Sequence, residues 1–130
     1  MARKKILMVD DAVTILMMET MFLSKEPYDL ITAKDGQEAI DQVESERPDL
    51  ILMDVVMPKM DGFEAVQKIR ENEATKSIPI IMVTTRGEED NMEKGYKNGC
   101  NDYVTKPING PELLTKIRNF LEEQVEHTAS

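Results

Sequence analysis

The chain alternates short apolar runs with longer segments in which apolar residues recur at helical spacing. A short continuous apolar run is typical of a strand that is buried on both faces of a sheet. Such runs predict five strands, at Lys5–Val9, Tyr28–Ala33, Asp49–Met53, Pro79–Val83 and Asp102–Thr105. The third run leads directly into the carboxylate of Asp54. Because burial of a carboxylate costs several kcal/mol, we expect Asp54 to lie at the mouth of its strand.

The segments between these runs predict five helices, at Ala12–Lys25, Gln37–Ser45, Gly62–Asn72, Glu88–Asn98 and Pro111–Gln124. Glycine or proline near the ends of several of these segments favours a turn there. The helix over Glu88–Asn98 is the weakest prediction, because it contains Gly95 and few apolar residues. Gly99 has the place of its C-terminal cap.

The first helix has more apolar residues than one buried face can use. Spacing of i, i+3 and i+7 predicts a core-facing stripe made of Ile15, Met18 and Phe22. Three further apolar residues fall off this stripe: Leu16, Met17 and Met21. We therefore expect part of this helix to present apolar surface to solvent, which would suit a partner helix bundle.

Alternating strands and helices with apolar strands predict an α/β fold with a doubly wound five-stranded parallel sheet. Crossover connections in such sheets are right-handed, which places helices on both faces. Ligands of these folds bind beyond the carboxyl ends of the strands. The residues that follow each strand are therefore the first candidates for a functional site.

Composition restricts the class of protein. The 130 residues suffice for one domain, which we expect to span residues 1–130. No stretch is long and apolar enough to cross a membrane, and the N-terminus lacks the layout of a signal peptide. The single Cys100 fits a reducing compartment, so we expect a cytoplasmic protein. A net charge of −9 argues against direct binding of nucleic acid.

Polar residues follow four of the five predicted strands. They are Asp10 and Asp11 after the first, Asp54 after the third, Thr84 after the fourth and Lys106 after the fifth. Two like charges about 4 Å apart repel by roughly 4 kcal/mol at an effective dielectric constant near 20. One lysine cannot offset three carboxylates, so either a carboxyl pKa rises or a cation binds.

Oxygen ligands of this kind favour Mg²⁺. With the metal bound, Asp54 can attack a phosphorus atom, while Lys106 and Thr84 interact with phosphoryl oxygens. Each signal alone is weak, since an Asp-Asp pair after a strand is common turn chemistry. Their combination at the ends of successive strands is what makes the prediction specific.

These residues resemble the response-regulator receiver domains of two-component signalling, in the CheY-like single-domain form. The resemblance covers about residues 4–123 and includes the Asp10-Asp11 pair, Asp54 within Met-Asp-Val-Val-Met-Pro-Lys-Met-Asp-Gly, Thr84, Tyr103 and Lys106-Pro107. It implies a flavodoxin-like (βα)5 fold with strand order 2-1-3-4-5. It also implies that the protein is a phosphorylation-activated signalling switch and not an enzyme in the ordinary sense.

The resemblance implies a specific chemistry. Asp54 accepts a phosphoryl group from a histidine kinase or a histidine phosphotransfer protein. Mg²⁺ is held by Asp11, Asp54 and the backbone carbonyl of Val56, and Asp10 supports the metal through water. Dephosphorylation by the domain itself is expected to be slow.

The resemblance also implies a switch. Thr84 moves toward the phosphoryl group, Tyr103 rotates inward, and the face made by the fourth helix, fifth strand and fifth helix changes for a downstream protein target. The run Glu88-Glu89-Asp90 lies on that face. The peptide bond between Lys106 and Pro107 is expected to be cis. We expect a monomer, with a phosphorylation-dependent dimer as the alternative.

Three positions depart from the family pattern or tune the lifetime of the phosphoryl group. Thr85 stands where a smaller residue is usual and narrows access to Asp54 in this interpretation. Val56 and Arg86 occupy the two positions that tune phosphoryl loss in the family. Valine cannot orient a water molecule, so we predict a long-lived phosphorylated state. Arg86 could act in either direction.

Other classes of protein account for fewer of these residues. Phosphohydrolases of the haloacid-dehalogenase type place a second Asp two residues after the nucleophile, where this chain has Val56. An FMN-binding flavodoxin-like protein would not place Asp10-Asp11 beside a phosphate. A degenerate receiver that binds partners without phosphorylation remains the alternative. The ordinary start and short tail favour a stand-alone regulator over the excised receiver of a longer protein.

Overall fold

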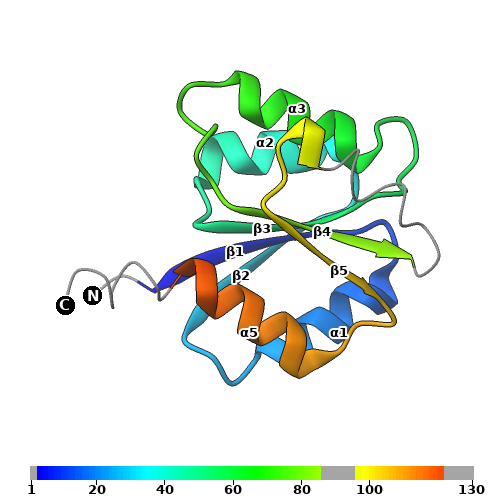
Figure 1. Ribbon diagram of the computed structural model, residues 1–130, viewed down its shortest axis with the longest axis vertical. Coiled ribbons are helices and arrows are strands. Elements are labelled where there is room, and N and C mark those ends of the chain that lie inside the picture. Colours follow the sequence, from blue (N-terminus) through cyan, green and yellow to red (C-terminus); the bar gives the residue numbers. More distant parts are fainter. Residues whose placement is uncertain (1–2, 86–95, 122–130) are drawn as a thin grey trace.

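The computed structural model describes residues 3–85 and 96–121 (Figure 1). Five parallel strands form one sheet in the order β2-β1-β3-β4-β5. The strands are β1 Lys4–Val9, β2 Tyr28–Ala33, β3 Leu50–Asp54, β4 Ile80–Thr85 and β5 Asp102–Lys106. The predicted fold class and strand order are confirmed.

The named helices are α1 Val13–Leu23, α2 Gly36–Glu46, α3 Gly62–Glu71 and α5 Gly110–Leu121. Helices α1 and α5 cover one face of the sheet, and α2 and α3 cover the other (Figure 1). Most of the helix predicted at Glu88–Asn98 lies outside the described residues, although residues 96–98 are helical and Gly99 follows them with a φ of 110°. None of the described helices is long and apolar enough to span a membrane.

The pleat of the sheet divides the core into two apolar clusters. Every residue of β3 is buried, and successive side chains point to opposite faces. Ile51 and Met53 join the cluster under α2 and α3. Leu50 and Leu52 join the cluster under α1 and α5. A parallel sheet covered on both faces requires such continuously apolar strands, which is why the strands were readable from the sequence.

The sheet edges are closed by side chains. At the β2 edge, Arg3 donates a hydrogen bond to the carbonyl oxygen of Tyr28 at 3.0 Å. At the β5 edge, Lys116 of α5 donates to the carbonyl oxygen of Tyr103 at 2.7 Å, and the Asp102 carboxylate accepts from the Tyr103 amide at 2.8 Å. Backbone groups of an edge strand that already form hydrogen bonds within the chain are less available for pairing with a strand of another molecule.

The core-facing residues of α1 differ from the predicted ones. The residues that face the core are Leu16, Glu19 and Leu23, which are buried, whereas Ile15, Met18 and Phe22 are half-buried beside them. Met17 and Met21 are 65% and 66% exposed, as predicted. The buried set has the same i, i+3, i+7 spacing, but the charge of Glu19 argued against it in the sequence.

One glycine fixes the loop that leaves β3. The amide of Gly62 donates to the carbonyl oxygen of Val55 at 2.8 Å, and Asp61 caps α3 by accepting from the amide of Glu64 at 2.9 Å. A Cβ atom on Gly62 would overlap the backbone carbonyl oxygen of Asp54. A side chain at position 62 would therefore push α3 away from the end of β3.

Candidate functional site

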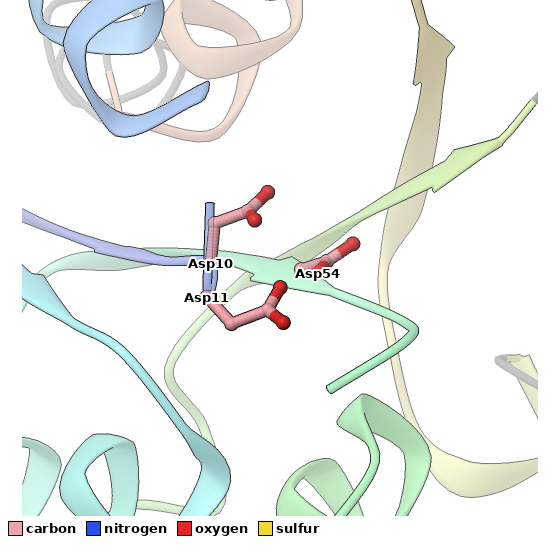
Figure 2. Close-up of side chains that lie close together, drawn as sticks. All are labelled: Asp10, Asp11 and Asp54. Carbon is pink, nitrogen blue, oxygen red and sulfur yellow. The ribbon is translucent and has the colours of Figure 1, made fainter. Parts of the chain in front are cut away.

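Three carboxylates meet at the carboxyl ends of β1 and β3. Figure 2 shows Asp10 and Asp11, which follow β1, together with Asp54, the last residue of β3. One carboxylate oxygen from each residue lies within 4.8 Å of the other two. β1 and β3 are neighbours in the sheet, so their ends lie side by side. The parallel topology thus joins residues that are far apart in the sequence.

The pleat explains the direction of three of the charged side chains. Met8, Leu52 and Val104 contact the apolar cluster under α1 and α5. Asp54 and Lys106 stand two residues further along the same strands, and Asp10 stands two residues beyond Met8, just past the end of β1. By the alternation of a strand, their side chains start toward this same face.

Lys106 binds both buried carboxylates. Its Nζ lies 3.1 Å from Oδ1 of Asp54, to which it donates a hydrogen bond, and 3.1 Å from Oδ2 of Asp10. The second contact is an ion pair and not a hydrogen bond, because Oδ2 of Asp10 has no hydrogen-bonding partner. Asp10 and Asp54 are 1% and 4% exposed, whereas Asp11 is exposed. The peptide bond between Lys106 and Pro107 is cis.

Burial and like charges change the acidity of the site. Burial, followed by the charge of Asp10, raises the pKa of Asp54 to about 6, although Lys106 acts in the opposite direction. Burial by itself would lower the pKa of Lys106, but the charges of Asp54 and Asp10 outweigh it and raise this pKa. The carboxylates of this site therefore carry more negative charge than the ammonium group of Lys106 can neutralise.

The donor set fits Mg²⁺. Carboxylate oxygens are hard ligands, and Mg²⁺ is usually bound through one or two carboxylates together with water or phosphate oxygens. The Oδ2 atom of Asp10 is buried and makes no hydrogen bond beside its ion pair with Lys106, so a cation or its water can still be accommodated there. Asp10, Asp11 and Asp54 can therefore hold the predicted metal.

The other predicted site residues lie around this cluster. Thr84 is buried near the end of β4, one residue beyond Val83, which pairs with Asp54. Thr85 and Val56 are exposed. Arg86 lies outside the described residues, as do Glu88, Glu89 and Asp90.

Thr84 and the predicted switch aromatic share a face of the sheet. Met82 contacts the cluster under α2 and α3, and Thr84 follows it at the next position on the same side of β4. Tyr103 of β5 pairs with Met82 in the ladder, is half-buried and packs against that same cluster. The two side chains are thus carried by adjacent strands on one face.

Cys100 has a packing role in the core. The side chain is buried, and burial raises the pKa of the thiol to about 11. A thiol with so high a pKa stays protonated near neutral pH and is a poor nucleophile.

The sequence prediction missed one charged residue close to this site. Glu19 of α1 is 1% exposed, and its Oε1 has no hydrogen-bonding partner. Burial, followed by the charge of Asp10, raises the pKa of Glu19 to about 8, while Lys106 lowers it. The spacing of Leu16, Glu19 and Leu23 at i, i+3 and i+7 indicated that Glu19 could share a buried face with the two leucines. The charge of Glu19 argued against that interpretation.

Comparison with known proteins gives concordant matches. The family model described as the response regulator receiver domain matches residues 6–118. The transcriptional regulatory protein PhoP of Bacillus subtilis, which regulates alkaline phosphatase synthesis, is 40% identical over 118 residues, or 91% of this chain and 48% of PhoP. The chain spans about half the length of several such curated relatives.

Two solved structures are similar to this chain in both sequence and fold. The chemotaxis protein CheY4 of Vibrio cholerae is 36% identical with a TM-score of 0.86, and the match covers 92% of this chain and 100% of CheY4. The receiver domain of a sensor histidine kinase of Pseudomonas aeruginosa is 31% identical with a TM-score of 0.84, and the match covers 92% and 98% of the two chains. That structure has a magnesium ion coordinated in the active-site cleft.

Proposed function

Because the chain belongs to the response-regulator receiver family, we propose that it is a phosphorylation-activated signalling switch with Asp54 as the phosphoacceptor. The observation that carries this proposal is the position of Asp54. It ends a buried strand, its carboxylate lies beside Asp10 and Asp11, and Lys106 is 3.1 Å away. A carboxylate nucleophile for phosphoryl transfer needs such compensating positive charge beside it.

The reaction follows from the ionisation of Asp54. With a pKa of about 6, the carboxyl group is mostly ionised at neutral pH. One of its oxygens attacks the phosphorus atom of a phosphohistidine, the P–N bond breaks, and the histidine nitrogen keeps the electron pair and takes up a proton. Lys106 moves from two carboxylates toward a phosphoryl oxygen, and the hydroxyl of Thr84 donates to another.

We assign the metal to Asp11, Asp54 and the backbone carbonyl of Val56, with Asp10 acting through water. When bound, Mg²⁺ supplies positive charge that screens the carboxylates from the phosphoryl oxygens. The magnesium ion in the similar Pseudomonas receiver domain supports this assignment.

Activation is proposed to work as a population shift. New charge-assisted bonds to the phosphoryl group draw Thr84 inward, and Tyr103 on the same face of the sheet rotates into the space that it leaves. The surface around β5 and α5 then changes for a downstream protein. The domain catalyses its own phosphorylation and slow dephosphorylation, without turning over a separate substrate. The alternative is a degenerate receiver that binds its partner without phosphorylation.

Helix α1 offers a surface for the phosphodonor. Val13, Met17 and Met21 are exposed on this helix, which has no acidic residue in its first turn and no basic residue in its last. We propose that the apolar surface contacts the helix bundle of a histidine kinase or phosphotransfer protein in the cytoplasm.

The proposal is tested by intact mass spectrometry after incubation with acetyl phosphate and Mg²⁺. We expect a gain of one phosphoryl group in the wild-type protein. The gain should be absent in Asp54→Asn and after removal of Mg²⁺ with EDTA. No gain in the wild-type protein would favour the phosphorylation-independent module. Thr85 would then be the first residue to test for blocking the access of the phosphodonor to Asp54.

Val56 is expected to prolong the phosphorylated state. Its exposed side chain has no polar atom to orient an attacking water molecule. We predict that Val56→Asn shortens the phosphoryl lifetime by roughly tenfold, because one hydrogen bond to the reacting water contributes about 1 kcal/mol. Phosphate release after removal of acetyl phosphate measures this lifetime, with Val56→Ala as the matched apolar control. Equal lifetimes for wild type and Val56→Asn would contradict the role of position 56.

A further inference from the structure

Two side chains in the described part of the chain, Tyr96 and Lys116, contact the ring of Tyr103. Tyr96, which is 47% exposed, meets it edge-on, with ring centroids 6.2 Å apart and an interplanar angle of 80°. Lys116 of α5 places its Nζ 5.0 Å from the centre of the Tyr103 ring. Both arrangements are favourable, the first between the positive edge and negative face of two rings and the second between a cation and a π-system.

Lys116 is itself held in place. Its Nζ lies 3.1 Å from the Asp102 carboxylate and donates to the backbone carbonyl oxygen of Tyr103 at 2.7 Å. The same carboxylate accepts from the Tyr103 amide at 2.8 Å. The ammonium group is thus anchored to the backbone of the residue whose ring it faces. An anchored cation loses less side-chain entropy when it contacts the ring than a free lysine would.

We propose that Tyr96 and Lys116 form a clasp that restrains Tyr103 and opposes its inward rotation. This inference rests on the proposed function and deepens it, because it names the residues that set the threshold of the switch. Tyr96 is 47% exposed, and Lys116 reaches the ring from α5, which covers the opposite face of the sheet (Figure 1). Inward rotation would give up both contacts.

The clasp acts on an equilibrium. A residue that favours one of two positions lowers the apparent affinity for any ligand that requires the other. A single cation–π or aromatic contact at a partly exposed site changes such an equilibrium by about fivefold. Tyr96 and Lys116 are therefore positioning residues that act through Tyr103, with no contact to the phosphoryl group.

The test is ¹⁹F NMR of protein labelled with 3-fluorotyrosine. The chain has three tyrosines, so Tyr96→Phe and Tyr28→Phe each identify one resonance and the third belongs to Tyr103. Beryllofluoride, a mimic of the phosphoryl group, is titrated at fixed Mg²⁺. We expect Lys116→Met and Tyr96→Leu to displace the starting Tyr103 resonance toward its endpoint and to lower the titration midpoint by about fivefold.

Conservative variants are the controls. Lys116→Arg keeps the cation and Tyr96→Phe keeps the ring, so both should titrate like the wild type. Arg118→Met removes a cation from the same helix and should also leave the midpoint unchanged. Because Tyr96 is at the surface, Tyr96→Leu keeps the test valid if Lys116→Met does not fold.

The outcomes separate the two proposals. A wild-type Tyr103 resonance that moves with beryllofluoride, but has the same start and midpoint in both clasp variants, overturns the clasp and leaves the switch intact. A wild-type resonance that never moves overturns the proposed switch and the clasp with it. A higher midpoint in the variants would show that the clasp favours the activated position, which contradicts its proposed role.

Discussion

Replacing Lys106 with methionine is expected to slow the phosphorylation of Asp54 by acetyl phosphate by two to three orders of magnitude. Loss of one preorganised charge or donor at a developing anion costs about 10²- to 10³-fold in rate. Lys106 is positioned for this role, because its Nζ already lies 3.1 Å from Asp54 and from Asp10. Its removal also leaves these buried carboxylates without their cation. The pKa of Asp54 should then rise above about 6, which leaves less of the ionised nucleophile at neutral pH.

The rate is measured by intact mass at fixed Mg²⁺ and pH. Lys76→Met is the matched control, because Lys76 pairs with Glu73 at the surface, with side chains 49% and 86% exposed. This variant should react at the wild-type rate. Circular dichroism of both variants shows whether the fold is retained. A Lys106→Met protein that is folded and reacts within threefold of the wild type would remove Lys106 from the mechanism.

Replacing Glu19 with glutamine is expected to stabilise the protein at neutral pH. The pKa of Glu19 is raised from 4.5 to about 8 in the folded protein. Below pH 4.5 the group is protonated in both the folded and unfolded states and costs nothing. Between pH 4.5 and 8 the unfolded chain ionises while the folded protein keeps the proton, so stability falls as pH rises. Each pKa unit corresponds to about 1.4 kcal/mol, which gives a gain of about 4 kcal/mol for Glu19→Gln at pH 7.5.

Urea denaturation without Mg²⁺ at pH 5 and pH 7.5 measures this difference. The free energies of unfolding of Glu19→Gln and wild type should differ by less than about 1 kcal/mol at pH 5 and by several times more at pH 7.5. Glu44→Gln, on the exposed side of α2, is the matched surface control. A Glu19→Gln difference that is the same at both pH values would mean that Glu19 is ionised in the folded protein.

The strands were predictable because burial on both faces leaves a continuous apolar run that needs no knowledge of the partners. All five predicted strands exist in the structure, with ends shifted by a residue or two. The site residues were predictable for a related reason, since parallel strands bring their carboxyl ends to one edge. The convergence of Asp10, Asp11 and Asp54 followed from that rule together with the resemblance to receiver domains.

The face of α1 was not predictable in the same way. Ile15, Met18 and Phe22 and the buried set around Glu19 have the same helical spacing, so the pattern allowed both faces. Hydrophobicity favoured the wrong one, because a glutamate is expected in water. The orientation of a helix is decided by the surface on which it packs, which the sequence of the helix does not contain.

The sequence by itself determined that the chain forms a parallel α/β sheet with an acidic site and one lysine at the strand ends. The tertiary structure decided how the charges are paired. It placed Lys106 between Asp54 and Asp10, and it joined Lys116 to Tyr103 across the edge of β5. Periodicity reports burial along one segment, whereas these contacts join side chains from different segments. Their geometry depends on strand register and helix packing, which exist only in the folded chain.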